Sequence, residues 1–225
     1  MAIIAPVRKD VQEPEEGKKY STSLRFWHWA NVIIISGSLL TVLLNSTLLN
    51  SNTNANFIKD KLQETSVNVT KDQARSVAHA LGDKVWNIHA YFGYCLAALL
   101  LFRLLLEFFQ KKDQKFTLKL KSAYTQYKIA KNRQLARHEV VVKSIYLLFY
   151  LLLILMALTG LFLAFEDELA AYKSIRHTVK DIHGFCMYLV LAFIVVHLAG
   201  VFLAERKDSK GIVSDMINGG DLSNS

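Results

Sequence analysis

The sequence predicts an all-α integral membrane protein, a bundle of four transmembrane helices. Of its 225 residues, 52% are apolar or aromatic and only 20% are charged, and the mean hydropathy is +0.22. This composition excludes a disordered chain. The apolar residues are gathered in four blocks that are separated by polar, Lys-rich stretches. Each block supplies the roughly 20 residues that a helix needs to cross a bilayer.

The four blocks define the expected domain organisation. They cover residues 26–58, 85–102, 144–165 and 182–204. The first block is not expected to be a cleaved signal peptide, because a long polar tail precedes it and no short apolar core with a small-residue cleavage pattern follows. We expect an N-terminal tail at 1–23, the bundle at 24–206 with a long loop at about 45–84 and a basic loop at about 111–139, and a C-terminal tail at 207–225.

Lysine and arginine predict the orientation, since acidic residues contribute little to it. One side of the bundle carries 18 of these residues, in the two tails, in the basic loop after the second block and, at the adjoining helix ends, at Arg25, Lys143 and Arg206. The opposite side carries eight. Because basic loops stay inside, both termini are expected in the cytoplasm.

The net charge of +8 follows from these cytoplasmic loops, so nucleic-acid binding is not expected. The two cysteines, Cys95 and Cys186, lie inside apolar blocks without a CxxC or CxxCH pattern and are interpreted as packing residues. The sequence also lacks a Gly-rich phosphate loop, a nucleophile elbow and an HExxH motif.

The informative residues are histidines. His79, His138 and His177 lie outside the apolar blocks or at their edges, where ordinary loop or interfacial roles are expected. Four others lie within the blocks: His28, His89, His183 and His197. An ionisable group at membrane depth is a functional hypothesis by default.

The depths of these four histidines match in pairs. The direction of each helix places His89 and His183 toward the outer face, and His28 and His197 toward the inner face. His183 and His197 are fourteen residues apart, which is roughly 21 Å along a helix and only about 40° around its axis. They therefore share one face of the fourth helix at two depths.

Two histidines on facing helices at equal depth can hold a haem iron from both sides, so the pattern predicts two bis-histidine haems b. Three glycines near the ligands would let a flat ring approach the backbone: Gly93, Gly184 and Gly200. Zinc is a poorer interpretation because it usually takes three or four ligands. A proton relay would normally include a carboxylate, and Glu107 is the one intrahelical candidate.

Two arginines are candidates to bind haem propionates. Arg103 lies fourteen residues after His89, the same interval that separates His183 from His197, and should therefore face the bundle at the depth of the inner haem. Arg25 is a second candidate, because a planar guanidinium suits a carboxylate. The alternative for Arg103 is that it extends to the interface and pairs with Glu107.

These motifs resemble the prokaryotic di-haem cytochrome b561 family over about residues 20–219. The resemblance rests on Arg-Phe-Trp-His-Trp at 25–29, Ile-His-Ala-Tyr-Phe-Gly at 88–93, a third helix without histidine, and His-Gly followed by a histidine fourteen residues after the first. The family includes the b-type cytochrome subunits of membrane-bound nickel-iron hydrogenases, and Met-Ile-Asn-Gly at 216–219 is similar to the end of those members. The long outer loop and the Lys-rich inner loop depart from the family pattern.

The resemblance implies that His89 and His183 bind the outer haem and that His28 and His197 bind the inner one. It also implies electron transfer between a periplasmic redox partner, such as a hydrogenase or another dehydrogenase, and the quinone pool. The chain would then be an electron-transfer subunit rather than a self-sufficient enzyme. Two alternatives stay open at this stage: a stand-alone quinone oxidoreductase, and a haem-free transporter or assembly component.

Overall fold

The computed structural model describes residues 22–109, 124–125, 127, 133–207 and 211–220. Within these residues the chain is helical and contains no strand. The order is α1 (Thr22–Ser46), α2 (Ser51–Glu64), α3 (Lys71–Phe109), α5 (Arg133–Ala164), the short 3-10 helix η2 (Ala170–Ile175), α6 (Arg176–Lys207) and α7 (Ile212–Asn218). The N-terminal tail and most of the basic loop lie outside the described residues.

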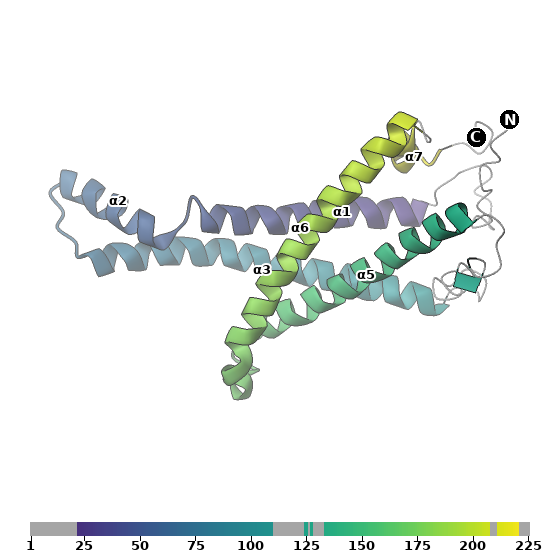
Figure 1. Cartoon of the computed structure of the whole chain (residues 1–225). Coiled ribbons are helices and arrows are strands. Elements are labelled where there is room, and N and C mark those ends of the chain that lie inside the picture. The colour runs from purple at the N-terminus through teal and green to yellow at the C-terminus, as the bar shows by residue number, and fades with distance from the viewer. Residues whose placement is uncertain (1–21, 110–123, 126, 128–132, 208–210, 221–225) are drawn as a thin grey trace.

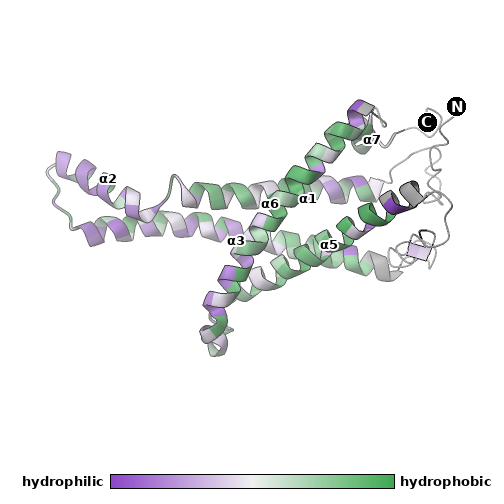
Figure 2. Cartoon of the chain, in the orientation of Figure 1, coloured by the Kyte–Doolittle hydropathy of each residue, from purple (hydrophilic) through white to green (hydrophobic). Residues whose placement is uncertain are grey.

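Four of these helices are long and apolar enough to cross a membrane, which confirms the predicted four-span bundle. The candidate spans are Thr22–Ser46, Lys71–Leu105, Val140–Ala164 and Ala170–Arg206. Their side chains are mostly exposed, as Ile33 (67%), Leu148 (66%) and Val195 (66%) show. An apolar surface of this extent is suited to lipid rather than water. Figure 2 shows the apolar residues along the middle of the long helices and polar residues in α2 and the start of α3.

The long helices do not all contact one another to the same extent. α3 lies antiparallel to α1 along much of its length and also contacts α2 and α5, while α6 packs along α5 (Figure 1). α5 and α6 carry three of the buried apolar side chains, Leu153 on α5 and Cys186 and Val190 on α6. In contrast, the backbone of α6 has little contact with α1 or α3. The bundle is therefore open on the side where α6 faces these two helices.

The segment expected as a long outer loop is largely helical. Asn50 caps α2, because its side-chain oxygen accepts hydrogen bonds from the backbone amides of Asn52 and Thr53. Thr70 and Gln73 form a reciprocal capping box at the start of α3, with distances of 2.9 and 3.2 Å. At about 1.5 Å per residue the 39 residues of α3 extend over about 58 Å, well beyond the roughly 30 Å of a hydrocarbon core.

The C-terminal segment folds back onto the start of the bundle. The Glu205 carboxylate accepts a hydrogen bond of 2.7 Å from the backbone amide of Gly211 and so holds the turn that leads into α7. Arg25 donates to the Ile217 carbonyl at 2.7 Å, and the Trp29 indole donates to the Met216 carbonyl at 3.2 Å. The first turns of α1 and the end of α7 therefore lie together at one end of the molecule.

Candidate haem site

The four intramembrane histidines come from three helices and form two pairs. The rings of His89 on α3 and His183 on α6 have centroids 6.4 Å apart, and we call them the 89/183 pair. The rings of His28 on α1 and His197 on α6 have centroids 6.3 Å apart, and we call them the 28/197 pair. All four side chains are half-buried. The structure thus brings together the same partners that the helix directions predict.

The ring separations fit two imidazoles on one metal ion. An imidazole nitrogen lies about 2.0 Å from a bound transition metal, so rings on opposite sides of one ion have centroids roughly 6 Å apart. The interplanar angles of 86° and 56° leave the rings of each pair crossed rather than stacked. Within the described part of the chain, no group of three or more His, Cys, Asp or Glu side chains is placed to hold a metal. These residues therefore offer two ligands per site, which suits haem better than zinc.

The backbone near these pairs leaves room for a flat group. A methyl group added at Gly93, Gly184 or Gly200 would meet no atom within 4 Å. In contrast, a methyl group at Gly160 would lie 3.2 Å from the His183 ring, so α5 approaches that imidazole closely there. The open positions lie on α3 and α6, whose backbones have little mutual contact. The residues present fit a haem between α6 and the helices that face it.

Hydroxyl groups surround the 89/183 pair. The Nδ1 atom of His89 lies 2.9 Å from Thr41 Oγ1 and 3.3 Å from both the hydroxyl and the carbonyl oxygen of Ser38. The Nδ1 atom of His183 lies 2.8 Å from Thr159 Oγ1. Both threonines are buried. The sequence analysis missed these residues, although a polar side chain inside an apolar span is itself a signal for a hydrogen-bonding partner.

The contacts found around the 28/197 pair are aromatic, without hydroxyl groups among the described residues. Phe193 stacks parallel to the His197 ring at 5.9 Å, and Phe149 stacks on Phe193 at 3.9 Å. The Trp29 indole contacts the His28 ring edge-on at 5.3 Å. The Nδ1 atom of His28 is buried and has no hydrogen-bond partner among the described residues. Among the described residues, this pair therefore shows none of the hydroxyl contacts that the 89/183 pair has.

The two candidate arginines lie at the 28/197 end. Arg103 Nε donates to the Tyr150 hydroxyl at 3.3 Å, and the Tyr150 ring lies 5.7 Å from the ring of Trp27, the neighbour of His28. The side chain of Glu107 lies outside the described residues, and so does the alternative pairing of Arg103 with Glu107. Arg25 uses its terminal nitrogens on Ile217 and Thr22, while its buried Nε has no partner in the described part of the chain.

The edge histidines stand apart from both pairs. His79 pairs with Asp83 at 3.1 Å and His177 pairs with Asp181 at 3.0 Å, each one helical turn on and each exposed. The side chain of His138 lies outside the described residues. Surface pairs of this kind contribute little to stability. These contacts agree with the interfacial role that the sequence suggests for His79 and His177.

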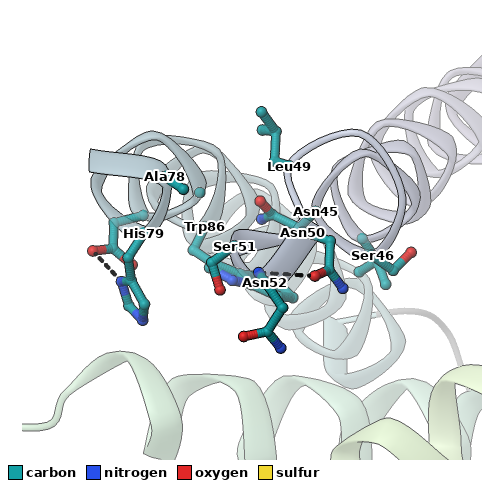
Figure 3. Close-up of a pocket in the computed structure, with 12 residues that line it drawn as sticks. Asn45, Ser46, Leu49, Asn50, Ser51, Asn52, Ala78, His79 and Trp86 are labelled. Atoms are coloured by element: carbon teal, nitrogen blue, oxygen red, sulfur yellow. Dashed lines mark hydrogen bonds and ion pairs between the residues drawn. The ribbon is translucent and has the colours of Figure 1, made fainter. Parts of the chain in front are cut away.

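A polar pocket of about 230 Å³ lies where α1, α2 and α3 meet (Figure 3). Asn45, Asn50 and Asn52 line it from one side, and His79 and Trp86 line it from α3. It is smaller than the roughly 300–1,000 Å³ of most small-molecule sites. The Trp86 ring also contacts the His89 ring edge-on at 5.4 Å, so one aromatic side chain separates the pocket from the 89/183 pair.

A helical bundle with paired intramembrane histidines defines the class of membrane b-type cytochromes. The family model for prokaryotic cytochrome b561 matches residues 19–219. The chain therefore belongs to this family and is a multi-pass membrane cytochrome that binds b-type haem and transfers electrons, as the resemblance in its sequence implies. No curated protein and no solved structure matches the chain.

Proposed function

We propose that the chain is a di-haem cytochrome that carries electrons across the bacterial inner membrane. His89 and His183 hold one haem b, and His28 and His197 hold the other. The observation that carries this proposal is the presence of two imidazole pairs at 6.4 and 6.3 Å with no third ligand among the described residues. The pairs lie roughly 21 Å apart along α6.

The histidines determine what each site can do. Bound haem supplies reversible one-electron chemistry at the iron. Because two imidazoles would hold each haem, the sites would offer substrate no ligand position and would supply electron transfer alone. The apolar helices exclude water, and the side chains around each imidazole adjust the potential of its site.

The basic residues support a definite orientation, with both termini in the cytoplasm. The 28/197 pair is then the inner site and the 89/183 pair the outer site. Contacts between α1 and α7 place the start of α1 and the end of α7 on one side of the bundle, as four spans require. The inner site would exchange electrons with the quinone pool, and the outer site with a periplasmic partner.

The partner is proposed to be a hydrogenase or another dehydrogenase that docks on α2 and the first turns of α3. Beyond the apolar spans these helices expose Phe57 (60%) and Val77 (52%), and the pocket that ends at Trp86 lies beside them. A stand-alone cytochrome that exchanges electrons with quinone is the second candidate. Crosslinking from α2 positions in native membranes, followed by identification of the captured protein, distinguishes the two.

The inner end also supplies unused hydrogen-bond donors. Arg25 Nε and Trp27 Nε1 are buried without a partner in the described part of the chain. Arg103 donates to the Tyr150 hydroxyl, and the Tyr150 ring in turn contacts the Trp27 ring. Donors of this kind suit the carboxylates of a haem. We therefore propose that Arg25 and Arg103 bind propionates of the inner haem.

A visible spectrum of the purified protein, with haem quantified per chain, tests the proposal. The expected result is two low-spin haems b per chain that are reduced in two steps. A chain without haem would instead support the transporter or assembly alternative. One haem per chain would show that only one of the two histidine pairs binds haem.

A further inference from the structure

The two threonine hydroxyls beside the 89/183 pair donate their hydrogens to backbone carbonyls, which leaves their oxygens as acceptors for the imidazoles. Thr41 Oγ1 lies 2.6 Å from the Ser38 carbonyl oxygen, to which it donates its single hydrogen. Its oxygen must therefore accept from His89 Nδ1, which lies 2.9 Å away. The Ser38 carbonyl, 3.3 Å from the same nitrogen, is also an acceptor. The proton of His89 is thus assigned to Nδ1.

The same logic holds for His183. Thr159 Oγ1 donates to the Leu155 carbonyl at 2.7 Å, with the Met156 carbonyl a second acceptor at 3.2 Å. The threonine oxygen then accepts from His183 Nδ1 at 2.8 Å. A neutral imidazole that carries its proton on Nδ1 has its lone pair on Nε2. Both histidines of the pair therefore present Nε2 as the free ligand nitrogen.

Hydrogen bonding at the remote nitrogen also changes the ligand's strength. An acceptor for the Nδ1 proton makes the imidazole more basic, and a more basic ligand favours the ferric over the ferrous ion. No such acceptor is found for His28 Nδ1 among the described residues. The two sites therefore differ in the contacts behind their ligands rather than in the ligands themselves.

We propose that Thr41 and Thr159 are positioning residues of the outer haem site, which fix the tautomer of His89 and His183 and lower the reduction potential there. This inference rests on the proposed function. A purely structural role is the alternative, because threonines in membrane helices often bond to a preceding carbonyl. Thr47, the residue after the end of α1, shows that bond alone: its Oγ1 donates to the Leu43 carbonyl at 2.6 Å, and no histidine contacts it among the described residues.

Thr41→Val and Thr159→Val keep the side-chain shape and remove the threonine acceptor, which leaves only the more distant Ser38 oxygens, at 3.3 Å, beside His89 Nδ1. Redox titration of the membrane protein with its haems, resolved by visible spectra, should show the ferrous-to-ferric ratio of one haem rising in each variant. We expect an increase of about tenfold at fixed potential, which is about 59 mV for one electron. The Thr→Ser variants should restore the wild-type value, and Thr47→Val should leave both haems unchanged.

Several outcomes would overturn the inference. One is an unchanged potential in both Val variants, and another is a shift no larger than that of Thr47→Val. A shift that Thr→Ser fails to restore would assign the effect to packing. If a Val variant is not recovered folded, Thr→Ala at the same position takes its place. In each case two low-spin haems in the wild-type chain would leave the proposed function standing, whereas a wild-type chain without haem would remove both proposals.

Discussion

The 89/183 pair and the 28/197 pair hold their rings at almost the same separation, 6.4 and 6.3 Å, but they differ in what lies behind the rings. Threonine hydroxyls contact the first pair, while Phe193 and Trp29 contact rings of the second. The arginine candidates lie only at the second. The comparison teaches that the placement of the paired histidines and the contacts behind their rings come from different parts of the sequence, so each can be altered alone.

The largest effect is expected from removing a ligand, because the iron then loses an axial bond. His89→Ala or His183→Ala should abolish the low-spin signal of one haem, and His28→Ala or His197→Ala that of the other. Visible and electron paramagnetic resonance spectra measure both signals. His177→Ala, at an exposed residue that pairs with Asp181, is the control and should keep both haems. Two low-spin haems in all four ligand variants would contradict the pairing.

Cysteine labelling tests which pair lies outside. In a variant whose Cys95 and Cys186 are replaced by serine, a cysteine at Asn68, between α2 and α3, should react with an impermeant reagent applied to the periplasmic side. A cysteine at Ser214 in α7 should react only after the membrane is opened. Both positions are exposed. The reverse pattern would make the 28/197 pair the outer site and exchange the proposed roles of the pairs.

Filling the open space beside a pair should reduce haem content at that pair. A leucine in place of Gly93 or Gly200 meets no protein atom at its first carbon, so the chain itself should tolerate it. If a porphyrin occupies this space, haem content should fall several-fold at the 89/183 pair for Gly93→Leu and at the 28/197 pair for Gly200→Leu. Haem per chain measures the effect, and Gly→Ala at the same positions is the milder control. Full haem content in both leucine variants would place the porphyrins elsewhere.

The smallest effect is expected from Arg103. Arg103→Leu removes a positive charge from the 28/197 end and should lower the potential of that haem by tens of millivolts, from an interaction of about 1 kcal/mol in a partly screened site. Arg103→Lys keeps the charge and should recover most of the value. Tyr150→Phe removes the hydroxyl that Arg103 contacts and separates its effect from that of the charge. Equal shifts at both haems would contradict a local role.

The sequence predicts the spans and the histidine partners because both depend on one-dimensional properties. Apolar length sets the number of helices, and helix direction sets which histidines share a depth. The first block, 26–58, predicts the end of the first helix less reliably, because a segment without charged residues can still contain polar ones. Its Asn-rich second half ends α1 at Ser46 and caps α2 through Asn50.

The hydroxyl contacts could not be predicted in the same way. Thr41 and His89 are 48 residues apart, and their contact depends on how α1 and α3 are rotated about their axes. Gly37 contributes to that packing, because a methyl group there would overlap the Phe92 ring. Apolar spans exposed to lipid on one side give only a weak signal for such rotation. The partners of the ligand histidines therefore follow from tertiary packing.

The contact between α7 and α1 also sets an order of events during biosynthesis. Trp29 and Met216 are separated by 187 residues, so their hydrogen bond cannot form until nearly the whole chain has been synthesised. At about 5–20 residues per second, translation separates the two by roughly 10–40 s. His197 is also synthesised late, 169 residues after His28, so the two rings can meet only when most of the chain has been made. The first span thus enters the membrane well before α7, which contacts the first turns of that span, has been synthesised.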